Sequence, residues 1–437
     1  MKTYNDALDW IHSRLRFGIK TGFERMNALL KKLNYPEREI KAIHIGGTNG
    51  KGSTLTYMRS ILQEAGYTVG SFTSPYIETF NERISVNGKP INNDEILQLV
   101  NVIKPLVDQL EKEEDIIPTE FEIITAMCFY YFAFVKQVDI VLVEVGLGGR
   151  LDSTNVVMPE LSIITSIGLD HTHILGNTLS EIAKEKAGII KQRRPVVSAV
   201  KQIEAVRVIQ ETSEKQASPL FMLQKDFFAK HVNSLENGEA FSYRSETLDL
   251  KNLIISMHGR HQVENASLAI KGIELLNEKN DWNISSEHIR EGLKSAFWPV
   301  RMEVVIKKPM VILDGAHNRE GVEVLCNTIE EKFSDKEVTI LFTALLDKDI
   351  TSMIDQLKGI SDQLLLTTFD FPRAPSSQQL SDFANEYNVK YTENWKDFIV
   401  KQQSIMTSSD LLVITGSLYF LSEVREYIVK LLENKNN

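Results

Sequence analysis

The stretch Gly46-Gly47-Thr48-Asn49-Gly50-Lys51-Gly52-Ser53 decides the fold of this chain. Residues 41–45 before it, with Ile43 and Ile45, predict a strand, and Leu55, Met58 and Leu62 after it stand at helical spacing. A glycine-rich turn between a strand and a helix lets backbone N–H groups approach an anion, which the positive end of the helix also attracts. The pattern therefore predicts an α/β fold with a phosphate-binding loop.

This loop departs from the commonest phosphate-binding loop, because Gly52 separates Lys51 from Ser53. A glycine-rich turn before a helix can also be purely structural. The lysine and the strand–loop–helix context favour phosphate binding, with Lys51 as the cation for the β- and γ-phosphates and Ser53 as a hydroxyl ligand.

Apolar runs alternate with helical patterns along the rest of the chain, which is typical of an α/β fold with a mainly parallel sheet. Residues 237–253 are more polar and are expected to form short strands or a surface excursion. A second α/β unit is expected to begin near Trp298-Pro299-Val300, which divides the chain into 1–298 and 299–437, with Pro299 as a hinge marker. The predicted strands are 69–72, 138–145, 161–167, 311–313, 338–343, 363–368 and 411–415.

Composition excludes several classes of protein. The chain is 43% hydrophobic and 25% charged, which is ordinary for a globular protein. Its length of 437 residues suggests two or three domains. A net charge of −10 argues against nucleic acid as the main partner. The isolated Cys128 and Cys326 make no disulfide framework or cysteine-type metal site, which fits a reducing cytoplasm. The first residues carry charge where a signal peptide would be apolar, and the apolar stretch 123–135 is expected to be a core helix, because it is shorter than the roughly 20 residues that cross a bilayer.

Further polar residues follow predicted strands, where the sites of α/β proteins collect. Ser74 follows residues 69–72, Glu144 lies at the end of 138–145, and His171 follows 161–167. A carboxylate in an apolar strand is costly unless it is paired or binds a metal, so Glu144 is expected to hold Mg²⁺ beside the phosphates or to pair with Arg150. His171 is an unusual Mg²⁺ ligand and could equally be a structural histidine.

An ordered set of motifs makes the chain recognisable. The set comprises Gly47-Thr48-Asn49-Gly50-Lys51-Gly52-Ser53, Thr73-Ser74-Pro75, Asn81-Glu82-Arg83-Ile84, Glu144 to Asn155 with its Gly-Leu-Gly-Gly-Arg-Leu-Asp run, Asp170-His171, Glu185-Lys186-Ala187-Gly188-Ile189 and Asp314-Gly315-Ala316-His317-Asn318. Together these motifs closely resemble the folylpolyglutamate synthases of the Mur ligase superfamily, including the bacterial form that also acts as dihydrofolate synthase. That family often has Trp-Pro-Gly-Arg where this chain has Trp298-Pro299-Val300-Arg301.

The resemblance implies roles for individual residues. Ser74, Glu144 and His171 would hold Mg²⁺. Lys186 would carry a CO₂-derived carbamate, although the helical pattern alone predicts a solvated surface lysine there. Lys51, Lys186 and His317 would be catalytic, with His317 beside the amino-acid site. ATP would be bound by Asn49, Gly50, Lys51, Gly52, Ser53, Asn265, Arg301 and Asp314. The folate substrate would contact Tyr76, Arg83, Thr119, Phe121 and Asp152, although Phe121 could equally be a core residue.

The implied fold is an N-terminal, P-loop-type ATPase domain with a mainly parallel sheet, followed by a smaller Rossmann-like domain. The implied activity is ATP-dependent addition of L-glutamate to tetrahydrofolate, and also the joining of dihydropteroate to glutamate, through an acyl phosphate. Alternatives are a monofunctional folylpolyglutamate synthase, a cell-wall peptide ligase of the Mur type and a non-catalytic nucleotide-binding module. A monomer without nucleic-acid or membrane partners is expected.

Overall fold

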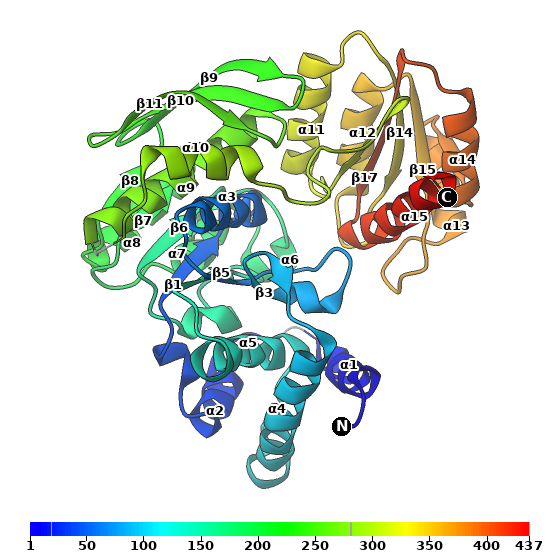
Figure 1. Cartoon of the computed structure of the whole chain (residues 1–437). Helices are drawn as coiled ribbons and strands as arrows, with labels where there is room; N and C mark the ends of the chain where they lie inside the picture. The colour runs from blue at the N-terminus through cyan, green and yellow to red at the C-terminus, as the bar shows by residue number, and fades with distance from the viewer. Residues whose placement is uncertain (19, 280–281, 437) are drawn as a thin grey trace.

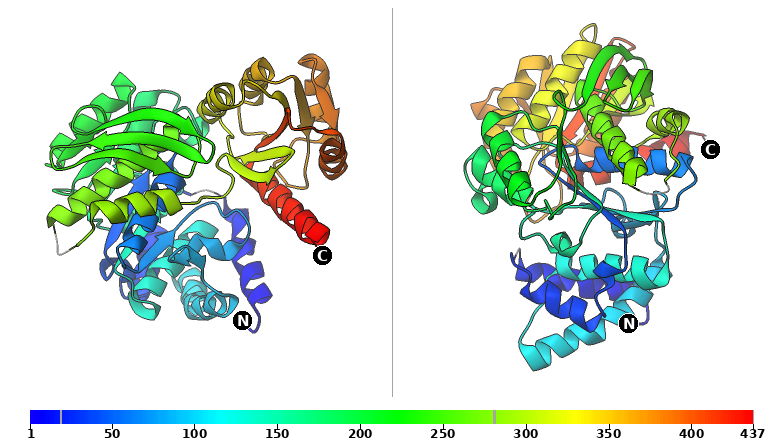
Figure 2. Two further views of the ribbon diagram at one scale, coloured as in Figure 1. Left: turned by 45° about the horizontal axis from the view of Figure 1, so that its top comes forward. Right: turned by 90° about the vertical axis from the view of Figure 1, so that its left-hand side faces the viewer.

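The structure, a computed structural model, describes residues 1–18, 20–279 and 282–436. Two lobes lie side by side in Figures 1 and 2. The N-terminal lobe runs from α1 (Tyr4–His12) to α10 (Ser286–Ser295), and the C-terminal lobe runs from β12 (Glu303–Lys307) to α15 (Leu418–Asn436). This arrangement confirms the predicted α/β fold with a second, smaller α/β domain.

An eight-stranded sheet forms the centre of the N-terminal lobe. Strands β2, β5, β1, β6, β7 and β8 pair in parallel, whereas β3 and β4 add an antiparallel edge. The order across the sheet is β4 (Lys89–Pro90), β3 (Ile84–Val86), β2 (Val69–Phe72), β5 (Ile140–Glu144), β1 (Ala42–Gly46), β6 (Leu161–Ile164), β7 (Val196–Ser198) and β8 (Leu220–Met222).

Side chains alternate between the two faces of this sheet, as strand geometry requires. Ile140 and Leu142 of β5 join a core cluster with α3 (Lys51–Glu64), α9 (Arg260–Lys279) and α10. Val141 and Val143 join the opposite cluster, with helices near the N-terminus. Both faces are therefore covered, which explains why the parallel strands are apolar throughout. The helices of the opposite cluster are α1, α2 (Glu24–Lys32), α4 (Asn93–Glu114) and α5 (Glu120–Tyr130).

Shorter elements complete the N-terminal lobe. For residues 237–253 the sequence left open short strands or a surface excursion, and the structure has strands there. The sheet they belong to begins earlier, at Phe228. It is an antiparallel ribbon of β9 (Phe228–Leu235), β10 (Gly238–Arg244) and β11 (Asp249–Ile255). The remaining elements are α6 (Thr172–Leu175), α7 (Leu179–Ala187), α8 (Ile203–Lys215), a π-helix at Tyr131–Val135 and 3₁₀ helices at Ser13–Phe17, Pro36–Arg38, Phe80–Arg83 and Ser153–Val156.

The C-terminal lobe has a six-stranded sheet covered by helices on both faces. Its strands pair in parallel except for the antiparallel edge strand β12. The sheet order is β12, β13 (Met310–Asp314), β17 (Asp410–Gly416), β14 (Glu337–Thr343), β15 (Gln363–Thr367) and β16 (Lys390–Thr392). The helices before α15 are α11 (Arg319–Lys332), α12 (Ile350–Ile360), α13 (Ser377–Glu386) and α14 (Trp395–Ile405).

A buried ion pair, here called the ribbon joint, ties the ribbon to the C-terminal lobe. Nζ of Lys332, at the end of α11, donates to Oε1 of Glu239 at 3.3 Å and to the carbonyls of Leu235 and Gly238 at 2.9 and 3.2 Å. Glu239 is fully buried and also accepts from Ser234 and from the backbone N–H of Gly259. The paired charges and satisfied oxygens make this a fixed contact between the lobes.

Each strand predicted from the sequence is present, although β5 and β6 are shorter than residues 138–145 and 161–167. The expected core helix at 123–135 is buried over most of its length, but Phe134 and Val135 are 47% and 51% exposed. Among the described helices, none combines the length and apolar character that a membrane crossing requires.

Candidate active site between the lobes

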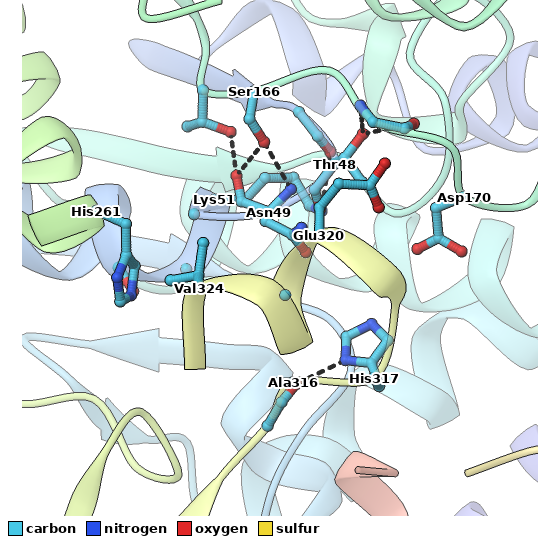
Figure 3. A pocket seen from close by; sticks show the side chains of 18 of the residues that line it. Thr48, Asn49, Lys51, Ser166, Asp170, His261, Ala316, His317, Glu320 and Val324 are labelled. Atoms are coloured by element: carbon cyan, nitrogen blue, oxygen red, sulfur yellow. Dashed lines mark hydrogen bonds between the residues drawn. The ribbon is translucent and has the colours of Figure 1, made fainter. Parts of the chain in front are cut away.

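A cavity of about 640 Å³ lies between the two lobes. On one side it meets the carboxyl ends of the neighbouring parallel strands β2, β5, β1 and β6, and on the other it meets the loops after β13 and β17. Figure 3 shows Thr48, Asn49 and Lys51 on the first side, with His317 and Glu320 from the C-terminal lobe nearby. The size suits a ligand as large as a nucleotide.

The backbone of the phosphate loop is held in place by the loop after β6. The N–H of Asn49 donates to Oγ of Ser166 at 2.9 Å, and Oγ1 of Thr165 donates to the carbonyl of Asn49 at 2.6 Å. Lys51 bends back over the loop, where its Nζ donates to the carbonyls of Gly47 and Thr48, both at 3.1 Å. The loop is thus preorganised, and its cation lies at the first turn of α3, where the helix dipole also favours an anion.

Gly50 and Asn265 are in close contact. Gly50 has φ +88°, and a Cβ added there would lie 2.3 Å from Oδ1 of Asn265. Asn265 belongs to α9 and donates to Gln262, which in turn donates to Oγ of Ser53 at 3.3 Å. A side chain at position 50 is therefore excluded twice, by backbone conformation and by space. Asn265 lies beside the phosphate loop although more than 200 residues separate them in sequence.

Glu144 lies at the end of β5 with its side chain buried. Among the described residues its hydrogen-bond partner is the backbone N–H of Ser74, 3.2 Å from Oε2. Burial raises the pKa of Glu144, while Lys51 and Arg301 oppose the rise. Arg150, the alternative partner, pairs instead with Glu185 at 2.8 Å, so that alternative is wrong. A buried carboxylate with so little compensation fits a site for a cation.

His171 and Asp170 follow β6 and also line the cavity. Burial lowers the pKa of His171 to about 4, so the imidazole is neutral and a ring nitrogen is free to act as a ligand. Asp170 accepts from Nζ of Lys348 in the C-terminal lobe at 2.6 Å. The described residues include no group of three or more His, Cys, Asp or Glu side chains placed to hold a metal. The predicted Mg²⁺ ligands do not form such a group, because one of the three is the hydroxyl of Ser74.

Lys186, on α7, is buried rather than solvated. Its Nζ donates to the carbonyl of Gly47 at 3.0 Å. Burial, with a further contribution from Lys51, lowers its pKa to about 7. A capping box begins this helix, in which the Thr178 side chain accepts the N–H of Glu181 and the Glu181 carboxylate accepts the N–H of Thr178. The helix therefore places an amine that loses its proton easily against the phosphate loop.

The C-terminal lobe contributes three predicted residues to the cavity. Burial lowers the pKa of Arg301 and raises that of Asp314. Asp314 uses both carboxylate oxygens to accept backbone N–H groups, from Met302 at 2.9 Å and Ala316 at 3.0 Å. His317 places Nδ1 2.7 Å from the carbonyl of Gly315, and burial lowers its pKa to about 4. The assigned tautomer is Nδ1–H, which leaves Nε2 as a proton acceptor.

All predicted nucleotide, metal and catalytic residues therefore line one cavity. The predicted folate residues do not line it. Thr119 caps α5 through a reciprocal bond with Glu122, and Phe121 packs against Gly146 and Phe72. The guanidinium of Arg83 lies over the ring of Tyr76, 5.1 Å from its centroid. These assignments stay predictions.

Asp152 has a structural task in this conformation. Its Oδ2 accepts from the N–H of Leu147 at 2.8 Å, and its Oδ1 accepts from the N–H of Thr154 at 3.0 Å. The hydroxyl of Thr154 also binds this carboxylate and lies 2.8 Å from Nε2 of His44, which is fully buried. The carboxylate thereby shapes the glycine-rich segment after β5.

Some cavity residues were not singled out from the sequence. They come from loops and from the first turns of α9 and α11, far apart in the chain, and a single sequence carries no signal that groups them. Asp170 stands in a quoted motif but received no role, and Lys348 lies in the loop after β14, outside the quoted motifs. The residues are Thr165, Ser166, Asp170, His261, Gln262, Glu320 and Lys348.

Val300 is the unusual residue of Trp298-Pro299-Val300-Arg301, and its backbone conformation is the one that glycine suits. Val300 has φ +52°, a left-handed conformation that a β-branched residue rarely adopts and that glycine adopts without strain. Its side chain is fully buried in the C-terminal core, and its carbonyl accepts from the N–H of Gly315 at 2.8 Å. Packing and this hydrogen bond keep the turn in the conformation that the glycine of related sequences suits.

Comparison with protein families assigns the two lobes to one superfamily. Residues 112–272 match the Mur ligase middle domain, and residues 300–418 match the Mur ligase glutamate ligase domain. With the nucleotide-type loop and the cavity between the lobes, these matches define an ATP-dependent ligase of the Mur type.

Full-length relatives narrow this class. The chain is 49% identical over 423 residues to the dihydrofolate synthase/folylpolyglutamate synthase of Bacillus subtilis, covering 97% of this chain and 98% of that protein. Its fold matches Mycobacterium tuberculosis folylpolyglutamate synthase complexed with ADP (TM-score 0.89, 28% identity, covering 97% of this chain and 99% of that one). It also matches a folylpolyglutamate synthase complexed with AMPPCP and folate (TM-score 0.86, 31% identity, covering 98% and 100%). The chain belongs to the folylpolyglutamate synthase/dihydrofolate synthase family.

Proposed function

We propose that this chain adds L-glutamate to tetrahydrofolate while ATP is converted to ADP and phosphate, and that it also joins dihydropteroate to glutamate to make dihydrofolate. The observation that carries the proposal is the cavity in which the phosphate loop of one lobe faces Arg301, Asp314 and His317 of the other. Family membership supports the ligase chemistry, and the name of the B. subtilis relative supports both reactions.

A carboxylate is a poor electrophile, so the reaction needs activation as an acyl phosphate. Phosphoryl transfer mainly requires positioning and neutralisation of charge. Lys51 and Arg301 supply positive charge on the two sides of the cavity, and the first turn of α3 supplies N–H groups to the phosphates. Closure of the lobes keeps water from the acyl phosphate.

The amine of glutamate must lose a proton as it attacks the acyl phosphate. His317 is placed to accept it, because burial keeps the imidazole neutral and Nε2 is its free nitrogen. The proton moves from the attacking nitrogen to Nε2, and phosphate leaves as the amide bond forms.

The residues present fit two further groups that the family implies. Ser74, Glu144 and His171 offer a hydroxyl, a buried carboxylate and a neutral imidazole to Mg²⁺, which supplies charge neutralisation to the phosphates when bound. Lys186 fits carbamylation, because CO₂ reacts with neutral amines and its pKa is lowered to about 7. The carbamate would place a negative charge at this position, beside Lys51.

We keep as part of the proposal the division at 298/299, the monomeric state, the cytoplasmic location and the folate contacts of Tyr76, Arg83, Thr119, Phe121 and Asp152. Phe121 packs beside Gly146, and Gly146 lines the cavity. A small shift of the Phe121 ring would therefore expose the ring to the cavity.

The test is ADP release by the purified chain with ATP, Mg²⁺ and glutamate, comparing tetrahydrofolate with dihydropteroate as acceptor. Turnover with both is expected. Turnover with tetrahydrofolate alone would leave a monofunctional folylpolyglutamate synthase. Release with neither acceptor would contradict the proposal.

A further inference from the structure

A reciprocal amide pair links the phosphate loop to the C-terminal lobe. Nδ2 of Asn318 donates to Oδ1 of Asn49 at 3.0 Å, and Nδ2 of Asn49 donates back to Oδ1 of Asn318 at 3.1 Å. Asn318 is 5% exposed. Because Asn49 belongs to the N-terminal lobe and Asn318 to the C-terminal lobe, the pair forms only when the lobes are together.

A second link runs from the same asparagine to the loop after β6. Nδ2 of Asn318 also donates to Oδ2 of Asp170 at 3.2 Å, and Nζ of Lys348 donates to Oδ1 of the same carboxylate at 2.6 Å. The side chains of Asp170 and Lys348 are only 12% and 10% exposed. Solvent and salt therefore screen this ion pair weakly. Asn49, Asn318, Asp170 and Lys348 are here called the closure latch.

The latch lies next to the C-terminal residues that face the phosphate loop. Asn318 directly follows His317, and both follow Asp314 in one short segment after β13. Glu320, on the first turn of α11, accepts the N–H of Leu169 at 2.9 Å and supports the same contact. Fixing Asn318 against Asn49 therefore fixes where His317 lies relative to the phosphate loop.

We propose that Asn318 and Lys348 are positioning residues, which hold the C-terminal lobe closed over the phosphate loop by binding Asn49 and Asp170. This places His317, Asp314 and Arg301 for catalysis before the substrates bind. The proposal rests on the proposed function for its kinetic consequences, but its structural consequence, a closed ligand-free chain, is independent of that function.

Asn318 also has a local role, and one substitution separates the two. Its Oδ1 accepts the N–H of Gly321 at 2.8 Å and so caps α11. Asn318→Asp keeps this cap, because aspartate caps helices as well as asparagine does. It removes the Nδ2 donor through which Asn318 binds Asn49 and Asp170, and it places a second carboxylate against Asp170.

The first experiment compares the wild type with Asn318→Asp. Small-angle scattering of the ligand-free chain is expected to give a larger radius of gyration for the variant, and kcat/KM for ATP is expected to fall about tenfold or more. The melting temperature should stay within a few degrees, because the cap remains. A matched control is Glu331→Gln, on the same helix, which breaks the exposed inter-lobe pair with Arg260. It should leave the radius of gyration unchanged and change kcat/KM by no more than about twofold.

The second experiment uses Lys348→Met and Lys348→Arg. The methionine variant is expected to open the ligand-free chain and to lower kcat/KM about tenfold, and the arginine variant is expected to restore part of both because it keeps the charge. If Asn318→Asp and Lys348→Met scatter like the wild type, the latch is overturned, whatever the assays show. Wild-type-like kcat/KM in folded variants would overturn the positioning role. If the variants open but the wild type releases no ADP with any acceptor, the proposed function fails and the latch stands.

Discussion

Lys186 and Lys332 are both buried, yet their surroundings differ. Lys332, in the ribbon joint, has Glu239 and two carbonyl oxygens as acceptors, and Nδ1 of His258 lies 2.6 Å from its Nζ. Lys186 has the carbonyl of Gly47 as its acceptor among the described residues and lies near Lys51. Burial lowers the pKa of both, but Glu239 opposes the effect at Lys332, whereas Lys51 adds to it at Lys186.

The difference separates a structural cation from a reactive amine. A buried lysine surrounded by acceptors stays charged and joins the elements that supply them. A buried lysine short of acceptors and near another cation loses its proton easily and becomes a nucleophile. Stability and activity should therefore respond in opposite ways when the two lysines are replaced.

The largest effect is expected from Lys51→Ala, which removes the cation that helps to lower the pKa of Lys186. Turnover should be abolished, a loss of at least about a hundredfold in kcat, because the phosphates lose the cation nearest the loop. Steady-state ADP release measures it, and the circular dichroism spectrum should be unchanged. Normal turnover in the purified variant would contradict the assignment of the phosphate loop.

Lys186→Ala should also remove most of the activity, by about a hundredfold, because the group that carries the carbamate is lost. Short carboxylates such as acetate or formate should restore part of it by replacing a carbamate oxygen. Lys184→Ala, at an exposed position on the same helix, is the control and should retain the wild-type rate. Full activity in Lys186→Ala would show that no carbamate is needed.

Lys186→Met should increase stability, with a distinct pH dependence. The folded pKa of Lys186 is about 7 against an ordinary 10.5, so the unfolded chain binds more protons between these values. The stability of the wild type therefore rises with pH across this window, and its penalty relative to the variant is largest below pH 7. Urea unfolding in CO₂-free buffer should show a gain on the order of a few kcal/mol at pH 6.5 that shrinks toward pH 10. A gain that does not vary with pH would sink this account.

Lys332→Met should do the reverse, lowering the free energy of unfolding by about 3 to 5 kcal/mol, because it leaves Glu239 buried without its cation. The rate of the folded variant should stay within about threefold of the wild type, since Lys332 does not line the cavity. Lys336→Met, at a less buried position beyond the same helix, should cost less than about 1 kcal/mol in urea unfolding. If Lys332→Met lowered the free energy of unfolding as little as Lys336→Met does, the ribbon joint would not be a structural ion pair.

The smallest effect is expected from Val300→Gly. Relief of left-handed strain should gain about 1 to 3 kcal/mol, and loss of the buried side chain should cost about 1.5 to 3 kcal/mol. The two nearly cancel, so urea unfolding should detect a change of no more than about 2 kcal/mol. A much larger loss would show that the turn carries little strain.

The sequence was a good guide wherever one element contains its own signal. The phosphate loop, Ser74 and Glu144 were predicted together because each follows a parallel strand, and the carboxyl ends of such strands meet at one edge of the sheet. The ribbon was placed too late because β9, with Phe228 and Val232 exposed, lacks the regular alternation of a half-buried strand.

By itself the sequence determined the order of strands and helices, the loop that meets phosphates and the family, because short-range patterns and motif residues encode all three. The tertiary structure alone decided that Asn318 contacts Asn49, that Glu239 receives Lys332 and that Lys186 is buried rather than solvated. The first two facts depend on how the two lobes meet, and the third depends on how α7 packs against the phosphate loop. Contacts between residues so far apart in the chain are set by packing, which a single sequence does not record.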